Sequence, residues 1–294
     1  MSLKKKLLIL GGDARYLEAI HLLANKGVDI TLIGYDQLQF QQKNVKIVNP
    51  EYFSYGLLDG VLLPVGGTDL EGKVEATYSD KPIHLTKEML IQTPEHCSVY
   101  TGAANKYLEK LTNQTNRKLT KIFQNEEMAI RNSIPTAEGA LHVAIEETDT
   151  TIHNSNVMIL GFGRVGMTLA RLFSAVGATV HVTVRNKTAA VKAYEMGLHS
   201  VWISELQKKI KDIDICLNTV PAPVLNKQVI ANLKKDCVII DLASAPGGTD
   251  FAYAKKQNIK AIHALGLPGK TAPKTAGKII GEAMYELLDD KINS

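Results

Sequence analysis

A short apolar run, residues 156–160, leads directly into the glycine series Gly161, Gly163 and Gly166, and this junction constrains the fold most strongly. At this spacing the first glycine can adopt the dihedral angles of a tight turn. The second leaves no side chain between the backbone and a pyrophosphate, and the third lets the following helix pack closely on the strand. The helix N-terminus then faces the anion. The stretch therefore predicts a strand, a turn and a helix that bind a dinucleotide.

The flanking sequence supports this interpretation over the alternative, a purely structural glycine turn in another α/β fold. Gly177 stands where a C-terminal cap is expected. Residues 179–184 alternate and are rich in β-branched side chains, as a second strand should be. The apolar positions after the turn recur with helical spacing on one face, at Val165, Leu169, Leu172, Phe173 and Val176.

The end of that second strand indicates which dinucleotide is bound. NAD enzymes usually carry Asp or Glu here for the ribose hydroxyls, whereas this chain has Arg185, Asn186 and Lys187. No carboxylate is present to repel a 2′-phosphate, and Arg185 offers two charge-assisted hydrogen bonds. The sequence favours NADP, with NAD as the second option. The alternative for Arg185 is a solvated loop charge.

A second series of strands and helices precedes this stretch. The apolar residues 7–10 run into Gly11 and Gly12, and further short strands alternate with helical segments up to about residue 123. Such alternation predicts an α/β protein with two doubly wound parallel-sheet domains, the C-terminal one a Rossmann domain and the N-terminal one flavodoxin-like or Rossmann-like. We expect an N-terminal substrate and catalytic domain over residues 1–134 and a linking helix over 135–150 that begins at Pro135. The NADP-binding domain then covers residues 151–294, and its last helix, 274–289, has the option of packing on the N-terminal domain.

Composition narrows the class of protein. The 294 residues, 45% of them hydrophobic, suit two domains. The net charge of +4 comes from scattered lysines without interleaved aromatic residues, which argues against nucleic-acid binding. Three cysteines without CxxC spacing favour a reducing cytosol, and no apolar run approaches the length of a membrane span. The eight histidines show no HExxH pattern, so we expect no metal site. These features predict a cytoplasmic protein.

Several motifs resemble those of the A subunits of bacterial dipicolinate synthase, over nearly the whole chain. They are Gly11 to Arg15, Ile134 to Gly139, Gly161 to Gly166, Asp241 to Ser244 and Leu267 to Pro273. The resemblance implies a sporulation enzyme of the mother-cell cytoplasm that works with a separate, flavoprotein-like B subunit, and a homo-oligomer is also compatible. The nucleotide half is more distantly similar to alanine dehydrogenase and 2-hydroxyacid dehydrogenases.

The activity implied by this resemblance is the oxidation of dihydrodipicolinate, formed from 4-hydroxytetrahydrodipicolinate on a branch of the lysine pathway, to dipicolinate with NADP+. Two alternatives stay open. One is a different NAD(P)-dependent dehydrogenase of amino or hydroxy acids, and the other is an NADP-binding sensor without turnover.

Candidate site residues follow from their positions at strand ends, where ligands of doubly wound folds bind. The residues expected to bind the cofactor are Gly161, Gly163, Arg164, Val165, Gly166, Arg185, Asn186, Thr219, Val220, Pro221, Ala243, Leu265 and Pro268.

A small dicarboxylate substrate also needs cations or backbone donors. We expect Gly12, Arg15, Gly66, Thr136 and Lys270 to bind it, with Gly11 and Gly12 contributing backbone amides. The alternatives without a role in binding are a surface charge for Arg15 and Lys270 and helix capping for Thr136.

Asp13, Glu138 and His263 are the candidates for the catalytic proton acceptor, and the sequence does not choose among them. A lone histidine near a strand end is more often a hydrogen-bonded core residue. The start of the predicted linking helix, with Thr136 and Glu138, is expected to line a cleft between the domains.

Overall fold

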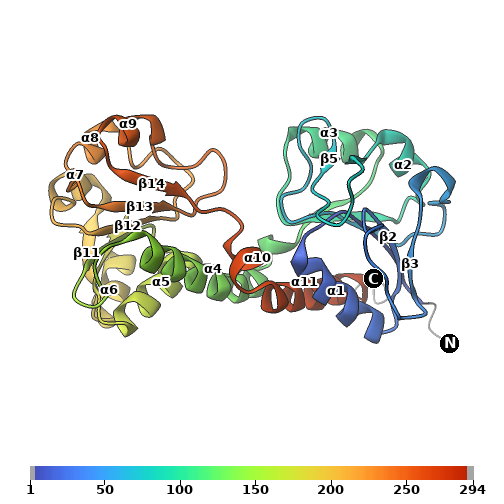
Figure 1. Cartoon of the computed structure of the whole chain (residues 1–294), viewed down its shortest axis with the longest axis horizontal. Helices are drawn as coiled ribbons and strands as arrows, with labels where there is room; N and C mark the ends of the chain where they lie inside the picture. Colours follow the sequence, from blue (N-terminus) through green and yellow to red (C-terminus); the bar gives the residue numbers. More distant parts are fainter. Residues whose placement is uncertain (1–3, 290–294) are drawn as a thin grey trace. The chain divides into compact units, whose positions relative to one another are not determined.

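A computed structural model describes residues 4–289 of the chain, which fall into two compact units (Figure 1). The first unit combines residues 4–129 with residues 272–289, and the second runs without interruption from Ile130 to Thr271. Each unit has its own sheet and its own core.

The first unit contains a six-stranded parallel sheet with the order β3-β2-β1-β4-β7-β8. A short antiparallel pair, β5 with β6, lies outside this sheet. The strands are β1 (Lys6–Leu10), β2 (Asp29–Ile33), β3 (Val45–Ile47), β4 (Gly60–Leu62), β5 (Lys73–Val74), β6 (Ile83–His84), β7 (Ser98–Thr101) and β8 (Leu119–Lys121).

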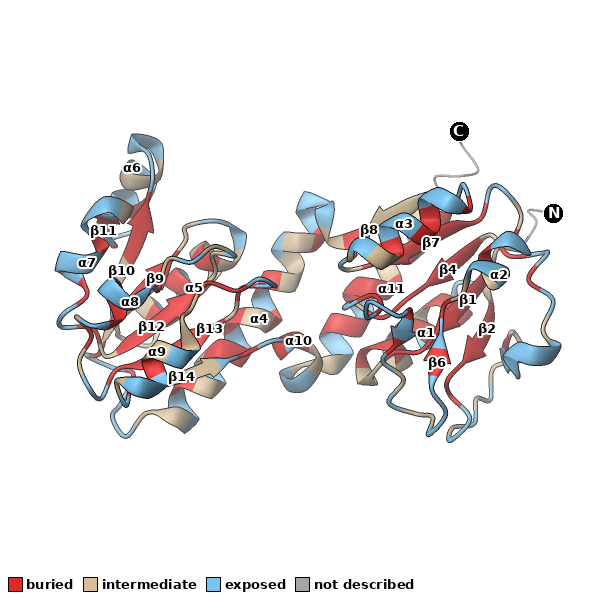
Figure 2. Ribbon diagram, turned by 90° about the horizontal axis from the view of Figure 1, so that it is seen from above, coloured by how far each residue is buried: buried red, intermediate tan, exposed pale blue. Residues whose placement is uncertain are grey.

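Helices cover both faces of this sheet (Figure 1). One core cluster joins the sheet to α1 (Ala14–Asn25) and α11 (Pro273–Asp289). The other joins it to α2 (Lys87–Ile91) and α3 (Lys106–Gln114). Two short 3₁₀ segments, η1 (Pro50–Tyr52) and η2 (Ile122–Gln124), complete the unit. The strands β1, β2 and β4 are buried almost throughout, as Figure 2 shows, because helices exclude water from both faces.

The helix α11 packs along α1 and thereby completes the first core. This close approach requires two glycines, since a Cβ on Gly277 would collide with the Arg15 carbonyl oxygen and one on Gly281 would lie 3.2 Å from the Ala19 Cα. Ile280 and Met284 add apolar side chains to the same cluster. The first unit therefore depends on residues that follow the second unit in the chain.

The second unit repeats the same topology, with the strand order β11-β10-β9-β12-β13-β14. When the strands of each six-stranded sheet are numbered separately, both sheets have the order 3-2-1-4-5-6 of a Rossmann fold. The prediction of two doubly wound parallel-sheet units is confirmed. The strands are β9 (Asn156–Leu160), β10 (Thr179–Val184), β11 (His199–Trp202), β12 (Ile215–Asn218), β13 (Val238–Asp241) and β14 (Lys260–His263).

The helices of the second unit again divide between the two faces. The helices α5 (Arg164–Ala175) and α6 (Lys187–Glu195) pack in one core cluster with part of α4 (Glu126–Glu147). On the other face lie α7 (Leu206–Lys209), α8 (Lys227–Ile230) and α9 (Phe251–Lys256). The short η3 (Ile203–Glu205) precedes α7, and α10 (Leu267–Thr271) ends the unit.

The long helix α4 corrects one expectation, because it begins at Glu126 and carries Pro135 in its interior. Its start has a conventional cap, since the Asn125 side chain accepts a hydrogen bond from the Met128 amide at 3.3 Å. Two acidic residues occupy its first turn. Thr136 is therefore a mid-helix residue, and its hydroxyl donates to the Asn132 carbonyl at 2.7 Å instead of capping the helix.

No helix within residues 4–289 is both long enough and apolar enough to cross a lipid bilayer.

Candidate functional site

The glycine turn after β9 is shaped by its neighbours on one side and open on the other. A Cβ on Gly161 (φ +95°) would lie 2.5 Å from the Thr219 hydroxyl oxygen, and one on Gly166 would collide with the Gly161 carbonyl oxygen. A Cβ on Gly163 would meet no atom within 4 Å. The protein itself thus requires glycine at the first and third positions. The second glycine leaves open space beside the N-terminus of α5, where the phosphate groups of a ligand can approach the protein backbone.

Two threonines fix this turn to the neighbouring strands. The Gly161 amide donates to the hydroxyl oxygen of Thr183, a buried residue of β10, at 2.8 Å. Thr219, at the end of β12, donates to the Leu160 carbonyl through both its amide (3.0 Å) and its hydroxyl (2.8 Å). The turn is therefore held from both sides before any ligand binds.

A groove of about 330 Å³ lies beside the turn. Of the residues predicted to bind the cofactor, the groove brings together Gly161, Gly163, Arg185, Asn186, Thr219, Val220 and Pro221. It is also lined by residues that the sequence analysis did not single out, namely Phe162, Thr183, Val184, Ala189 and Ile203. The alternation of side chains along β10 could have identified Thr183. Successive side chains of a strand point to opposite faces, and this polar residue stands near the carboxyl end of the strand, beside the turn.

The charge at the groove comes from Arg185, since its other lining residues are uncharged. Arg185 is exposed and follows β10 directly. The next residue, Asn186, caps α6 through a 2.8 Å hydrogen bond from the Ala189 amide to its side-chain oxygen. The groove therefore presents a guanidinium where an NAD site usually presents a carboxylate.

Two buried polar side chains organise the adjacent strand ends. The carboxylate of Asp241, fully buried at the end of β13, accepts hydrogen bonds from Asn218 Nδ2 (3.0 Å) and the Ala243 amide (2.9 Å). It also accepts from the Gly248 amide (3.1 Å) and the Thr249 hydroxyl (2.6 Å). Asp241 thus holds the loop after β13 in place.

The remaining residues predicted to bind the cofactor lie outside the groove. Gly166 is buried beneath the turn, and Arg164 is exposed at the start of α5. Val165 packs against the apolar core, and the Ala243 amide is already used by Asp241. The last two, Leu265 and Pro268, lie before and within α10, the first exposed and the second buried.

The glycine turn of the first unit is filled by protein, contrary to the expectation of free backbone donors. The Gly11 amide donates to the Ile33 carbonyl (2.9 Å), and the Gly12 amide donates to the Glu75 carbonyl (2.7 Å). A Cβ on Gly12 (φ +133°) would lie 2.6 Å from the Tyr16 ring and 2.9 Å from the Tyr35 hydroxyl. These glycines make room for the segment after β5 and for two tyrosines, so their amides are not available to a substrate.

Next to this turn, Asp13 and Arg15 form an ion pair. Arg15 donates from Nε and Nη2 to the Asp13 carboxylate, while Asp13 also caps α1. Burial alone would raise the pKa of Asp13, but the hydrogen bonds and charge of Arg15 outweigh it and hold the pKa below its ordinary value. Arg15 is 7% exposed, and its Nη1 has no hydrogen-bond partner within residues 4–289.

The other predicted substrate and catalytic residues lie on separate elements of the two units. Gly66 is exposed in the loop after β4, two residues before Thr68, whose buried hydroxyl lacks a hydrogen-bond partner in the described part of the chain. Glu138 and Lys270 are exposed on α4 and α10. His263 is exposed at the end of β14, and its ring lies 5.4 Å from that of Phe251.

Comparison with known families assigns each unit separately. The N-terminal domain of the dipicolinate synthase A subunit matches residues 6–123. The NAD-binding domain of D-isomer-specific 2-hydroxyacid dehydrogenases matches residues 130–250, which include the open glycine turn and its groove.

Relatives cover nearly the whole chain. The dipicolinate synthase A subunit of Bacillus subtilis (strain 168) is 45% identical over 283 residues, which are 96% of this chain and 95% of that protein. A crystal structure of the A subunit from Bacillus halodurans gives a TM-score of 0.94 at 45% identity and covers 97% of both chains. The crystal structure of the B. subtilis protein gives 0.91 at 44% identity and covers 99% of this chain and 97% of its own. A Sinorhizobium meliloti transhydrogenase, at 13% identity and a TM-score of 0.70, shares the fold alone; the alignment covers 97% of this chain and 94% of that one.

Proposed function

The chain belongs to the family of dipicolinate synthase A subunits and is a nicotinamide-dependent oxidoreductase, and from this premise we propose that it oxidises dihydrodipicolinate to dipicolinate with NADP+. The substrate is formed from 4-hydroxytetrahydrodipicolinate by loss of water. When bound, the nicotinamide accepts the hydride that leaves a ring carbon of the substrate. A proton leaves with it, and the aromatic ring of the product favours the step.

The observation that carries the proposal is the groove beside the open glycine turn. Gly163 leaves space for the pyrophosphate, and the N-terminus of the twelve-residue helix α5 faces it. Arg185 binds the 2′-phosphate through charge-assisted hydrogen bonds, which is why we assign NADP over NAD. Thr183 and Thr219 keep the turn in this conformation, so little ordering is needed when the cofactor binds.

The substrate carries two carboxylates and requires donors at the carboxyl edge of the first sheet. Arg15 offers Nη1, and the Thr68 hydroxyl supplies a further donor in the loop that contains Gly66. Thr136 and Lys270 are the corresponding candidates in the second unit. Because the Arg15 guanidinium is planar, it suits a carboxylate better than an ammonium group does.

For the proton, the ion pair with Arg15 argues against Asp13. A carboxylate whose pKa lies below its ordinary value is a weak base near neutral pH. Glu138 and His263, which are both exposed, are the stronger candidates for the proton acceptor.

Membership of this family implies a partner. We assign that role to a flavoprotein-like B subunit, and we place the activity in the cytoplasm of the mother cell during sporulation. A homo-oligomer of the present chain is compatible with this assignment.

A turnover assay with freshly generated dihydrodipicolinate, with and without the B subunit, tests the function. We expect the ultraviolet absorbance of the pyridine ring to appear together with an equal amount of NADPH. Turnover with amino or hydroxy acids alone would identify a different dehydrogenase. Cofactor binding without reduction, under every dicarboxylate tried, would identify a sensor.

A further inference from the structure

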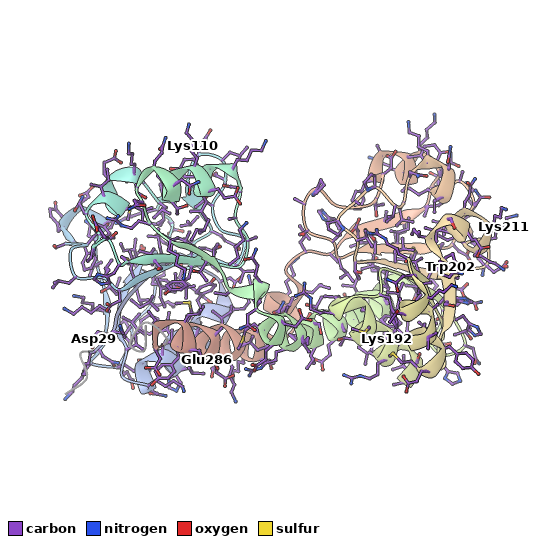
Figure 3. The ribbon with its side chains drawn as sticks, turned by 180° about the vertical axis from the view of Figure 1, so that it is seen from behind. Asp29, Lys110, Lys192, Trp202, Lys211 and Glu286 are labelled. Carbon is purple, nitrogen blue, oxygen red and sulfur yellow. The ribbon has the colours of Figure 1, made fainter. Side chains whose placement is uncertain are left out.

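A second groove in the first unit lies at the edge of the sheet opposite its glycine turn. It has a volume of about 360 Å³ and is formed where β1 and β2 begin, beside β3 and the segment after η1. Asp29, the first residue of β2, lines it and is labelled in Figure 3. The predicted ligand edge of the unit is at the other end of these strands, so this groove is separate from the proposed substrate site.

Three lysines give this groove a net positive charge. Lys6, Lys43 and Lys46 line it, and none of them forms an ion pair with a carboxylate within residues 4–289. Several other lysines do find partners, such as Lys121 with Glu109 at 2.9 Å. The one carboxylate that lines the groove, Asp29, leaves the site with an excess of positive charge.

Phe53 contributes an aromatic ring to the wall of the groove, and its neighbours hold this ring in place. The Lys46 ammonium lies 5.4 Å from the centroid of the Phe53 ring, and this ring packs edge-on against Tyr55 with centroids 5.0 Å apart. Asn44, another residue that lines the groove, is fixed by hydrogen bonds from its side-chain amide to the Ala24 and Val28 carbonyls at 2.9 and 2.8 Å. The groove therefore combines cations with a flat apolar surface.

We propose that this groove binds a small planar aromatic dianion, and that dipicolinate is such a ligand. Both of its carboxylates are ionised near neutral pH, as the lysines require, and its ring matches the face of Phe53. Only the choice of dipicolinate rests on the proposed function. The charge and shape of the groove are independent of the reaction, and its occupant takes no part in hydride transfer.

Isothermal titration calorimetry of the full chain with pyridine-2,6-dicarboxylate, in metal-free buffer, tests the proposal. We expect binding that weakens about tenfold in the double variant Lys43→Gln/Lys46→Gln, since two charge-assisted contacts are lost. The control variant Lys106→Gln/Lys110→Gln removes the same charge from exposed positions on α3 and should bind as the wild type does. Equal affinities and stoichiometries in all three proteins would overturn the proposal, as would absence of binding to the wild type.

A second variant reverses the sign of the effect. Asp29→Asn removes the negative charge from the groove with little change of shape, so it should tighten binding. Benzene-1,3-dicarboxylate, which keeps the ring and both charges, should bind, whereas glutarate and benzoate should bind more weakly. A glutarate affinity equal to that of the aromatic dianions would contradict the role of Phe53.

The turnover assay separates this proposal from the proposed function. Turnover without lysine-dependent dipicolinate binding leaves the enzyme assignment standing and removes the groove as a site. Lysine-dependent binding without turnover would support the groove as a site and contradict the proposed oxidation reaction.

Discussion

The two units share one strand order but use their first glycine turn differently. In the second unit, Gly163 borders open space next to a groove. In the first unit, Gly12 is enclosed by Tyr16 and Tyr35, and its amide is taken by Glu75. A Rossmann strand order therefore does not by itself create a dinucleotide site, because the space over the turn must also be left empty. One substitution in each of the two turns can test this difference.

The largest effect is expected for Gly12→Ala. The new methyl group would overlap the Tyr16 ring and force a left-handed backbone angle on alanine, which should destabilise the protein by about 3 kcal/mol. Denaturant unfolding measures this loss. Gly66→Ala is the matched control, because a Cβ there meets nothing within 4 Å. Unchanged stability in Gly12→Ala would mean that the first turn is open as well.

Gly163→Ala should separate binding from stability. Gly163 has an extended backbone (φ −92°, ψ −160°) that alanine also adopts, so stability should fall only by the cost of alanine at the N-cap of α5, about 1 kcal/mol or less. The methyl group would occupy the path of the pyrophosphate and weaken cofactor binding roughly a hundredfold, as expected for an overpacking cost of about 2–3 kcal/mol. Fluorescence of Trp202 offers a direct readout, since this single tryptophan, labelled in Figure 3, precedes the groove residue Ile203. Wild-type affinity in this variant would place the cofactor elsewhere.

Arg185→Asp sharpens the cofactor assignment. Loss of the charge-assisted contact should cost NADP binding roughly 1.5 to 3 kcal/mol, while NAD binding should change far less. Parallel titrations with the two cofactors make the comparison. Equal losses for NADP and NAD would refute the role of Arg185 at the 2′-phosphate.

The smallest effect concerns the filled turn and depends on pH. The pKa of Asp13 is lowered from 3.8 by Arg15, so the ion pair stabilises the fold above pH 3.8, and the contribution is lost as the pH falls through the lower, folded-state pKa. Asp13→Asn keeps a good helix cap but not the charge. The stability difference between wild type and variant should therefore shrink in acid. A difference that stays constant from neutral pH to pH 2 or below would contradict a stabilising ion pair.

Local sequence patterns were sufficient for the two parallel sheets and for much of the groove beside Gly163. Glycine spacing and β-branched runs are short-range signals, and they correctly predicted the strands on either side of Gly161 and the two doubly wound units. They also selected seven of the residues that line the groove.

Long-range contacts were outside the reach of those patterns. The backbone of Glu75 occupies the Gly12 turn although it lies about sixty residues further along the chain. The buried contact between Asn218 and Asp241 joins two strand ends in the same way. The start of α4 was predicted wrongly for a local reason. Proline is typical of a first helical turn, but Pro135 lies inside α4, and the residue that caps the helix is Asn125.

The return of α11 to the first unit has a consequence for synthesis on the ribosome. Residues 130–271 supply every strand of the second sheet in one uninterrupted stretch, whereas the first sheet remains uncovered beside α1 until residues 273–289 have been translated. The half that is synthesised first is thus the last to be finished, and the nucleotide-binding half can mature ahead of it.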